Sequence, residues 1–413
     1  MSNDVIVLGA GMVGVSTALH LQQRGRSVAL VDRRGVAEET SYGNTGIIQR
    51  EGIVPYLFPR EWATILRHAR NKSTEAAYQL SSLPSIAGYM FRYWRWSTPE
   101  GKASTAKAMT PLITRCVDEH EHLMTEAGIT GMMRRTGYLR LYRNEKEFDA
   151  AVREDEANKR AYGVNAKPVD RAGIAELEPH IKPVYAGGVF LADPVSVADP
   201  EAVGKAYGHL FTGRGGTFAE GEARSLTADG AGWKVATRDG WISAPDVVVA
   251  LGPWSDTVTR AQGLRLPFGV KRGYHMHYRA EGNATLSRPI IDTSYGYAMT
   301  QMTKGIRVTT GAEFATRDAP PNPVQLDRVE PLARMAFPIA ERLEAEPWLG
   351  RRPCLPDMLP VVGQAGGRNG LWLNFGHHHL GFTLGPVTGR LLAEMMTGEK
   401  PFTDPHPYRA ERF

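Results

Sequence analysis

Cysteine is nearly absent from this chain of 413 residues, which holds only Cys116 and Cys354. The two lie far apart in the sequence and form no CxxC pair, so the sequence predicts neither a disulfide framework nor a thiolate metal site. No other cluster of metal-ligating residues stands out, and we expect no metal. Such sparse cysteine suits a reducing compartment, and the expected location is the cytoplasm.

Long hydrophobic runs and long blocks of one charge are missing too. No segment reaches the roughly twenty apolar residues that a membrane-spanning helix needs. The apolar start at residues 5–21 lacks a basic region before it and contains regularly spaced glycines, unlike a signal peptide. The 49 basic and 44 acidic residues are spread along the chain, which disfavours a nucleic-acid partner. We expect no transmembrane segment, and at most a peripheral contact with the inner face of a membrane.

The first residues carry the pattern of a dinucleotide-binding βαβ unit. Val5–Leu8 predict a buried parallel strand, and Gly9, Gly11 and Gly14 follow at GxGxxG spacing before an apolar helix. The glycines permit a tight turn, close approach of backbone to a pyrophosphate, and close packing of the helix on the strand. The N–H groups and the dipole at the start of the helix favour phosphate binding.

A second predicted strand supports this interpretation, because it ends in Asp32, eighteen positions after Gly14. An acidic residue there is placed to bind a ribose hydroxyl, although the neighbouring Arg33 and Arg34 leave a 2′-phosphate cofactor open. The unit alone does not distinguish NAD from FAD. The cofactor-binding residues predicted from it are Gly9, Ala10, Gly11, Met12, Val13, Gly14, Asp32 and Arg33.

Four later segments carry a family resemblance. They read ETSYGNTG at 39–46, DVVVALGPWS at 246–255, RPCLPDMLPVVG at 352–363 and WLNFGHHHLGFTLG at 372–385. With these runs the sequence resembles the D-amino-acid oxidase superfamily of flavoproteins, and within it the small subunits of bacterial D-amino-acid dehydrogenases. It departs from the family pattern at Leu355, where threonine is usual.

The resemblance implies an α/β fold in which a Rossmann-type FAD-binding domain is interleaved with an antiparallel-sheet substrate domain. The expected FAD-binding parts are 1–50, 146–261 and 351–413, and the expected substrate-binding parts are 51–145 and 262–350.

The resemblance also implies further contacts with FAD. Family members that attach their flavin to a cysteine do so just before the RPxTPD-like run, where Gly350 stands here, so we expect non-covalent FAD. A helix starting near Pro386 should point its N-terminus at the flavin ring. The cofactor contacts carried over from the family are Ser41, Asn44, Thr45, Gly46, Gly252, Trp254, Gly376, His377, Leu380, Gly381 and Thr383.

On the substrate side, the resemblance assigns Arg352 to the substrate carboxylate, which a guanidinium can hold through two hydrogen bonds. The alternating run at 271–278 predicts a strand with one alternate set of side chains facing the pocket. Of the three adjacent histidines, His377 matches the family's histidine, whereas His378 and His379 either line the pocket or are polar loop residues. The expected catalytic residues are Arg352, Tyr274 and His377, and the expected substrate-binding residues are Arg352, Tyr274, His275, His379 and Tyr297.

The tryptophan-rich run at 92–96 predicts an amphipathic helix. It fits either a helix packed under the substrate domain or a patch that faces a membrane, and the packed helix is the preferred interpretation.

The activity implied by the resemblance is FAD-dependent oxidation of a small amino acid, most closely a D-amino acid or a proline derivative, by hydride transfer from Cα to flavin N5. The electron acceptor, quinone or oxygen, stays open. The alternatives are a secondary-amine oxidase of the sarcosine or N-methyl amino-acid type, a flavin-carrying subunit that works only with partner subunits, and an NAD-dependent dehydrogenase, which the glycine-rich C-terminal run disfavours.

Overall fold

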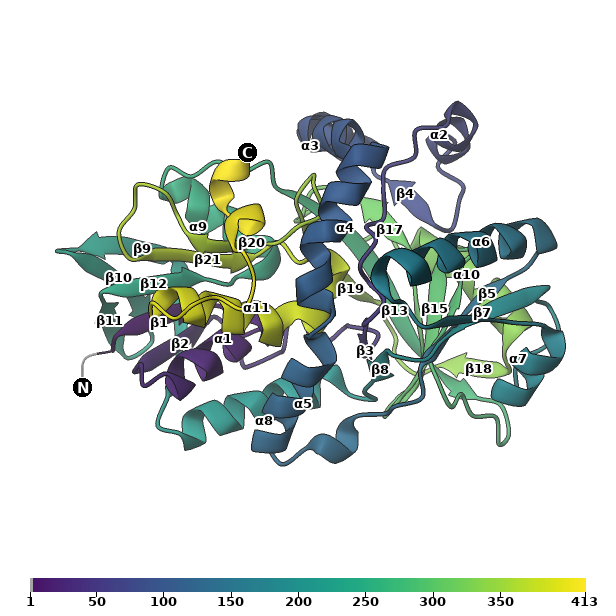
Figure 1. Ribbon diagram of the computed structural model, residues 1–413, viewed down its shortest axis with the longest axis horizontal. Helices are drawn as coiled ribbons and strands as arrows, with labels where there is room; N and C mark the ends of the chain where they lie inside the picture. Colours follow the sequence, from purple (N-terminus) through teal and green to yellow (C-terminus); the bar gives the residue numbers. More distant parts are fainter. Residues whose placement is uncertain (1–2) are drawn as a thin grey trace.

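The computed structural model describes residues 3–413, and its chain builds two sheets that lie side by side (Figure 1). The 8-stranded sheet holds both ends of the chain, and the 11-stranded sheet lies beyond the long helix α4. Within residues 3–413, no helix is both long and apolar enough to cross a bilayer.

The 8-stranded sheet is a Rossmann-type sheet with a parallel centre formed by β9, β2, β1, β12 and β21. Strands β2, β1, β12 and β21 of this centre are mainly apolar and mostly buried, as expected for parallel strands covered on both faces. In spatial order its strands are β11 (Gly240–Ala244), β10 (Gly232–Thr237), β9 (Thr217–Asp229), β2 (Val28–Asp32), β1 (Val5–Leu8), β12 (Asp246–Val249), β21 (Leu371–Phe375) and β20 (Val361–Gln364).

Five helices pack together on one side of this sheet, with α1 between α11 and α8 (Figure 1). The contact of α1 with α11 is very close, since a Cβ on Gly389 would lie 2.8 Å from the backbone nitrogen of Thr17. These helices are α1 (Met12–Gln23), α4 (Pro99–Ile113), α5 (Cys116–Glu126), α8 (Pro200–Gly213) and α11 (Gly381–Met396).

Helix α11 begins at Gly381, five residues before the expected start near Pro386. The prediction was wrong because Pro386 has no N–H to donate to the carbonyl of Phe382, which ordinarily breaks a helix. In the structure His120 Nε2–H of α5 donates to that carbonyl over 2.7 Å. A side chain distant in sequence therefore lets the helix continue through the proline.

The 11-stranded sheet is mainly antiparallel and is organised around the long strand β13. In spatial order its strands are β4 (Ala76–Tyr78), β17 (Ala312–Phe314), β13 (Gly269–Ala280), β16 (Gly305–Thr309), β15 (Tyr297–Met302), β14 (Ile290–Asp292), β5 (Tyr138–Tyr142), β7 (Gly187–Leu191) and β6 (Ala166–Val169), while β18 (Ile339–Arg342) and β19 (Trp348–Cys354) also pair with β13. A two-stranded ribbon, β3 (Ile47–Ile48) with β8 (Val195–Ser196), completes the strands.

The remaining helices surround the 11-stranded sheet, apart from α9, which packs on β9. They are α2 (Trp62–Ala69), α3 (Leu83–Trp96), α6 (Glu145–Tyr162), α7 (Arg171–Leu177), α9 (Ser255–Ala261) and α10 (Val324–Ala336).

The sheets divide the chain differently from the expected ranges. Within 146–261, strands β6 and β7 join the 11-stranded sheet through β5, and β9 to β12 join the 8-stranded sheet. Within 51–145, helices α4 and α5 pack on α11. The sequence has no linker-like segment where the chain passes from one sheet to the other, because strand pairing and helix packing between distant segments decide where it passes.

Candidate active site

The glycine turn after β1 leaves bare backbone where a ligand can approach. Gly9 has φ +105°, and a Cβ there would lie 2.4 Å from the carbonyl oxygen of Ala250. A Cβ on Gly14 would lie 1.7 Å from the Gly9 carbonyl oxygen. Both positions therefore exclude side chains, whereas a Cβ on Gly11 would meet only Ser41 Oγ, at 3.3 Å. The tight turn and close helix packing expected of GxGxxG are present.

Asp32 closes this turn at the end of β2. Its Oδ2 accepts a hydrogen bond from Ala10 N–H over 2.7 Å, and its Oδ1 accepts one from Arg34 N–H over 3.0 Å. Burial raises the pKa of its carboxyl group, while both backbone N–H groups favour the charged form. A cavity of about 340 Å³ lies against Gly9, Gly11, Asp32, Arg33 and Trp254.

A larger cavity of about 1120 Å³ lies between the two sheets. Thr40, Gly252 and Pro253 line both cavities, so the two form one continuous site. The expected residues that line the large cavity are Met12, Val13, Ser41, Asn44, Thr45, Gly252, Tyr274, His275, Tyr297, Arg352, His377, His379 and Gly381. Ala10, Gly14, Gly46, Gly376, Leu380 and Thr383 line neither cavity with their own atoms.

The loop at 41–46 forms a wall of the large cavity, and hydrogen bonds within the loop and to two other parts of the chain hold it in place. Ser41 Oγ accepts from Met12 N–H over 2.9 Å, and Asn44 Oδ1 accepts from Gly46 N–H over 2.8 Å. Gly46 has φ +74°, and a Cβ there would lie 2.2 Å from the Val197 carbonyl oxygen. Arg307 of β16 donates to the carbonyls of Tyr42 and Asn44. The arginine thus ties this loop to the opposite sheet.

The histidine run lies at the N-terminus of α11, where all three side chains line the cavity. His377 Nε2 lies 2.9 Å from Thr388 Oγ1, and the His379 ring lies 5.2 Å from the Tyr56 ring. Burial lowers the pKa of both His377 and His379 to about 3, with the charges of Arg352 and Lys271 adding to the effect at His379. Both rings are therefore uncharged near neutral pH.

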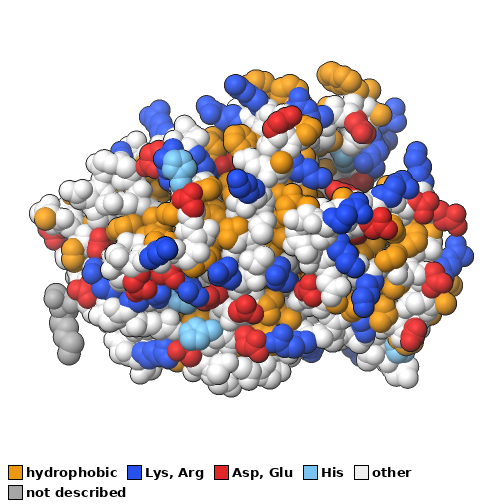
Figure 2. Space-filling view, in the orientation of Figure 1, with side chains coloured by type: hydrophobic (Ala, Val, Ile, Leu, Met, Phe, Trp, Pro, Cys, Tyr) orange, Lys and Arg blue, Asp and Glu red, His pale blue; other side chains and the backbone are white. Residues whose placement is uncertain are grey.

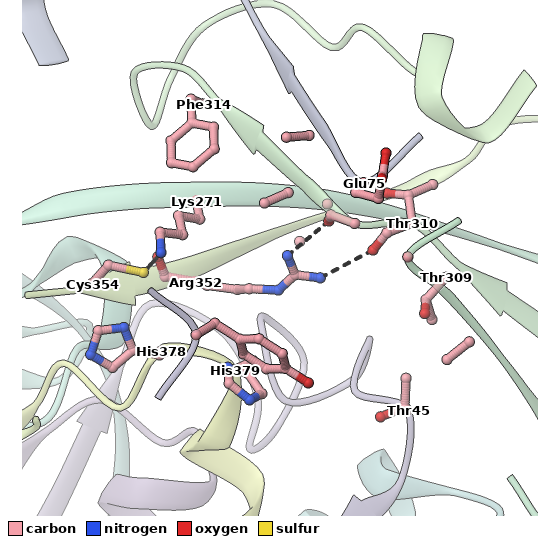
Figure 3. A pocket seen from close by; sticks show the side chains of 18 of the residues that line it. Thr45, Glu75, Lys271, Thr309, Thr310, Phe314, Arg352, Cys354, His378 and His379 are labelled. Carbon is pink, nitrogen blue, oxygen red and sulfur yellow. Dashed lines mark hydrogen bonds between the residues drawn. The ribbon is translucent and has the colours of Figure 1, made fainter. Parts of the chain in front are cut away.

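Arg352 of β19 extends into the cavity beside His379 (Figure 3). Its guanidinium donates to two backbone carbonyls, Gly311 over 2.9 Å and Thr310 over 3.4 Å. It takes part in none of the ion pairs of residues 3–413. Burial lowers its pKa from the usual arginine value, yet it stays protonated. The cavity thus contains a cation without an anionic partner.

Tyr274 and Tyr297 were expected to contact the substrate, but their hydroxyl groups form hydrogen bonds within the protein. Tyr274 Oη donates to Glu313 over 3.0 Å and also bonds to Arg272 and the Asn322 backbone. Tyr297 Oη donates to the Leu332 carbonyl over 3.3 Å and accepts from Arg143. Both tyrosines line the cavity, but these networks hold their hydroxyls in the protein interior.

The first half of β13 lines the cavity, and the second half does not. Lys271, Gly273, Tyr274 and His275 line it, whereas Met276 and Tyr278 belong to the core on the other side of the sheet. Lys271 Nζ lies 3.8 Å from the centre of the Tyr93 ring, and Lys271 has no acidic partner among the described residues. Sequence reasoning missed Lys271, although strand alternation from His275 would have found it.

Tyr56 was also missed, because it lies in an irregular segment with no motif. Tyr56 is 63% exposed and lines the large cavity. Its ring packs beside His379, and Tyr93 Oη donates to its carbonyl. Tyr56 therefore forms part of the wall next to Arg352.

Comparison with known proteins identifies the family. A family model described as FAD dependent oxidoreductase, DAO, matches residues 4–395. The chain is 32% identical over 410 residues to a D-amino acid dehydrogenase of Paramagnetospirillum magneticum, with 95% of each chain covered. It is 28% identical to a D-amino-acid oxidase of Bradyrhizobium diazoefficiens, covering 99% of this chain and 98% of the relative.

Solved structures share the fold. Glycine oxidase from Geobacillus kaustophilus superposes with a TM-score of 0.76 at 20% identity, covering 100% of this chain and 99% of the other. L-proline dehydrogenase from P. horikoshii gives 0.72 at 19% identity, covering 100% and 98%. The predicted Rossmann-type FAD-binding fold is therefore confirmed.

The site fits FAD on its own geometry. The small cavity beside Asp32 suits the adenosine end, the glycine turn suits the pyrophosphate, and the large cavity has room for a flavin ring with a substrate. Residues that line the large cavity also hold buried polar atoms without protein partners among the described residues: Asn374 Oδ1, His275 Nε2 and both ring nitrogens of His378. Such atoms call for a polar ligand. The chain belongs to the DAO family of FAD-dependent oxidoreductases.

Proposed function

We propose that this enzyme oxidises small D-amino acids at the bond between Cα and nitrogen, with Arg352 binding the substrate carboxylate. One observation carries the assignment: among the described residues, the half-buried guanidinium of Arg352 lines the cavity and bonds only to two backbone carbonyls. A charge partly removed from water without a counter-ion is costly, and a bidentate carboxylate would supply both the charge and the missing hydrogen bonds.

The electrostatics of the part of the cavity around Arg352 and Lys271 favour an anionic group, although Glu75, Glu147 and Glu154 also line the cavity. Arg352 and Lys271 both line it, and the nearby His377 and His379 are uncharged at neutral pH. Near these two cations a substrate ammonium loses its proton to water more readily than in solution, because like charges disfavour the charged form. The amino acid therefore binds with a neutral amine, whose lone pair is needed when the Cα–H bond breaks.

FAD, when bound, supplies the two-electron oxidant that accepts the hydride. The residues of this chain orient the substrate and exclude water. Arg352 fixes the carboxylate, Tyr56 and His379 form the adjacent wall, and the mainly apolar lining that includes Met358 and Phe314 suits a small apolar side chain. The resulting imine is hydrolysed to a keto acid, or stays cyclic when the substrate is a proline derivative.

The D configuration is supported by the names of the two relatives described above, which align over nearly the whole chain. The test is anaerobic flavin reduction by purified holoenzyme with matched D-amino acids, L-amino acids and N-methyl amino acids. We expect fast reduction by small D-amino acids such as D-alanine or D-proline. Faster reduction by sarcosine would indicate the N-methyl amino-acid type instead, and faster reduction by L-amino acids would reverse the configuration.

A further inference from the structure

Large hydrophobic side chains are exposed on one short part of the molecule. Six of the eleven exposed large hydrophobics in the described chain come from residues 62–96, on α2, α3 and the 3-10 turn η1 (Leu80–Ser82). None of the six lines the active-site cavity. They are Trp62 (77% exposed), Leu66 (63%), Leu80 (73%), Phe91 (59%), Trp94 (36%) and Trp96 (39%).

Helices α2 and α3 each have one face on the cavity and an apolar face on the outside. In α2, Ile65 and His68 line the cavity, whereas Trp62 and Leu66, four positions apart, point to solvent. No residue of α2 is buried. Such a helix gains little from packing, so its exposed apolar face indicates an interaction surface rather than a core.

Helix α3 packs by one face, where Ile86, Tyr89 and Tyr93 are buried, as expected for an amphipathic helix, and its other face is exposed. In α3, the Phe91 and Trp94 rings stack with centroids 6.0 Å apart on the outside. Tyr93, between them in sequence, is buried and lines the cavity wall.

Positive charge surrounds these apolar groups. Residues 60–96 contain six arginines and lysines, all exposed, against two glutamates. One of the glutamates, Glu75, already pairs with Arg67 over 2.9 Å. Figure 2 shows orange and blue side chains together along the edge where Figure 1 places α3 and α2. The six cations are Arg60, Arg67, Arg70, Lys72, Arg92 and Arg95.

We propose that this α2–α3 surface docks the enzyme on an anionic lipid bilayer. Tryptophan, phenylalanine and leucine on the outer face of amphipathic helices insert at the boundary between headgroups and acyl chains, and flanking arginines and lysines bind anionic headgroups. Docking through a second copy of the same surface is disfavoured, because it would bring two positive surfaces together. The inner faces of the same helices line the cavity, so docking places a wall of the active site at the lipid.

The test is flotation of the full-length holoenzyme with vesicles on a density gradient. We expect the enzyme to float with vesicles of phosphatidylcholine and phosphatidylglycerol in equal parts, and much less with pure phosphatidylcholine. High salt should release much of it, since the attraction to headgroups is screened.

Two variant sets separate the apolar and the ionic contributions. Trp62→Ser with Leu66→Ser and Phe91→Ser should lower the bound fraction about tenfold, whereas Trp241→Ser, at a side chain 59% exposed on β11, should not.

The second variant set reverses the charge of two arginines on α3 and should remove the preference for vesicles that contain phosphatidylglycerol. We expect this from Arg92→Glu with Arg95→Glu, and not from Arg238→Glu with Arg279→Glu at side chains 75% and 68% exposed. All variants should keep wild-type flavin content and flavin reduction without vesicles.

The proposal is overturned if wild type floats with neither vesicle, or if the control variants lose binding as much as the surface variants. It is equally overturned if wild type self-associates in solution without binding vesicles and the triple serine variant is monomeric, because the surface is then a protein interface.

Discussion

Arg352 is the residue on which the amino-acid assignment depends. Arg352→Ala should retain FAD but lose substrate affinity and flavin reduction together, because a displaced Cα can slow hydride transfer by about a hundredfold. Arg352→Lys should recover only part of the loss, since an ammonium cannot form two parallel hydrogen bonds. Anaerobic stopped-flow reduction measures both. An amine substrate without a carboxylate is the control and should respond little. Equal rates and saturation for wild type and Arg352→Ala would make Arg352 a structural residue.

Asp32, beside the small cavity, is the residue on which the assignment of the adenosine end of FAD depends. Asp32→Ala removes the acceptor for a ribose hydroxyl and for Ala10 N–H, so FAD affinity should fall by about 1.5–3 kcal/mol. Asp32→Glu should retain more FAD. Flavin fluorescence during dilution measures the release, and heat or acid should free intact FAD from wild type. Glu220→Ala, on the neighbouring strand and paired with Asp32 in register, is the control. Unchanged FAD retention in Asp32→Ala would contradict this assignment.

At the scale of elements, α11 depends on a side chain from α5. His120→Ala would leave the Phe382 carbonyl without its 2.7 Å hydrogen bond in a buried position. Leaving a buried carbonyl unpaired costs about 1–3 kcal/mol, and the lost imidazole volume adds to it. Chemical unfolding of the holoenzyme should show a lower free energy of unfolding.

His120→Gln, which can donate to the same carbonyl, should restore part of this stability. If His120→Ala unfolds at the wild-type midpoint, the hydrogen bond does not stabilise the helix through its proline.

For the molecule as a whole, buried histidines should make the protein sensitive to mild acid. Burial lowers the pKa of His20 and His377 to about 3 and of His120 to about 4. Unfolding exposes these rings, which then bind protons with a pKa near 6.5. The free energy of unfolding therefore holds the full contribution of these histidines above about pH 6.5. It loses this contribution as the pH falls towards the pKa values of the folded state, because protons then bind preferentially to the unfolded chain.

Each such histidine should add about 1.4 kcal/mol per pH unit to the slope of the unfolding free energy once the unfolded ring is protonated. Urea unfolding between pH 7.5 and pH 5 measures the slope. His20→Gln should reduce this slope by the contribution of one proton, about 1.4 kcal/mol per pH unit. An unchanged slope in that variant would show that His20 titrates alike in both states.

Local patterns in the sequence determined the βαβ unit, with its strand, glycines, helix and Asp32, because tight turns and buried parallel strands depend on residues close together in the chain. The same holds for the cofactor and the family, which short glycine-rich and proline-containing runs identify. Only the tertiary structure decided that the hydroxyl of Tyr274 bonds to Glu313, that Lys271 lines the cavity, and that Trp62 and Phe91 face outward. These outcomes depend on strand pairing and helix packing between segments distant in sequence, which no local pattern encodes.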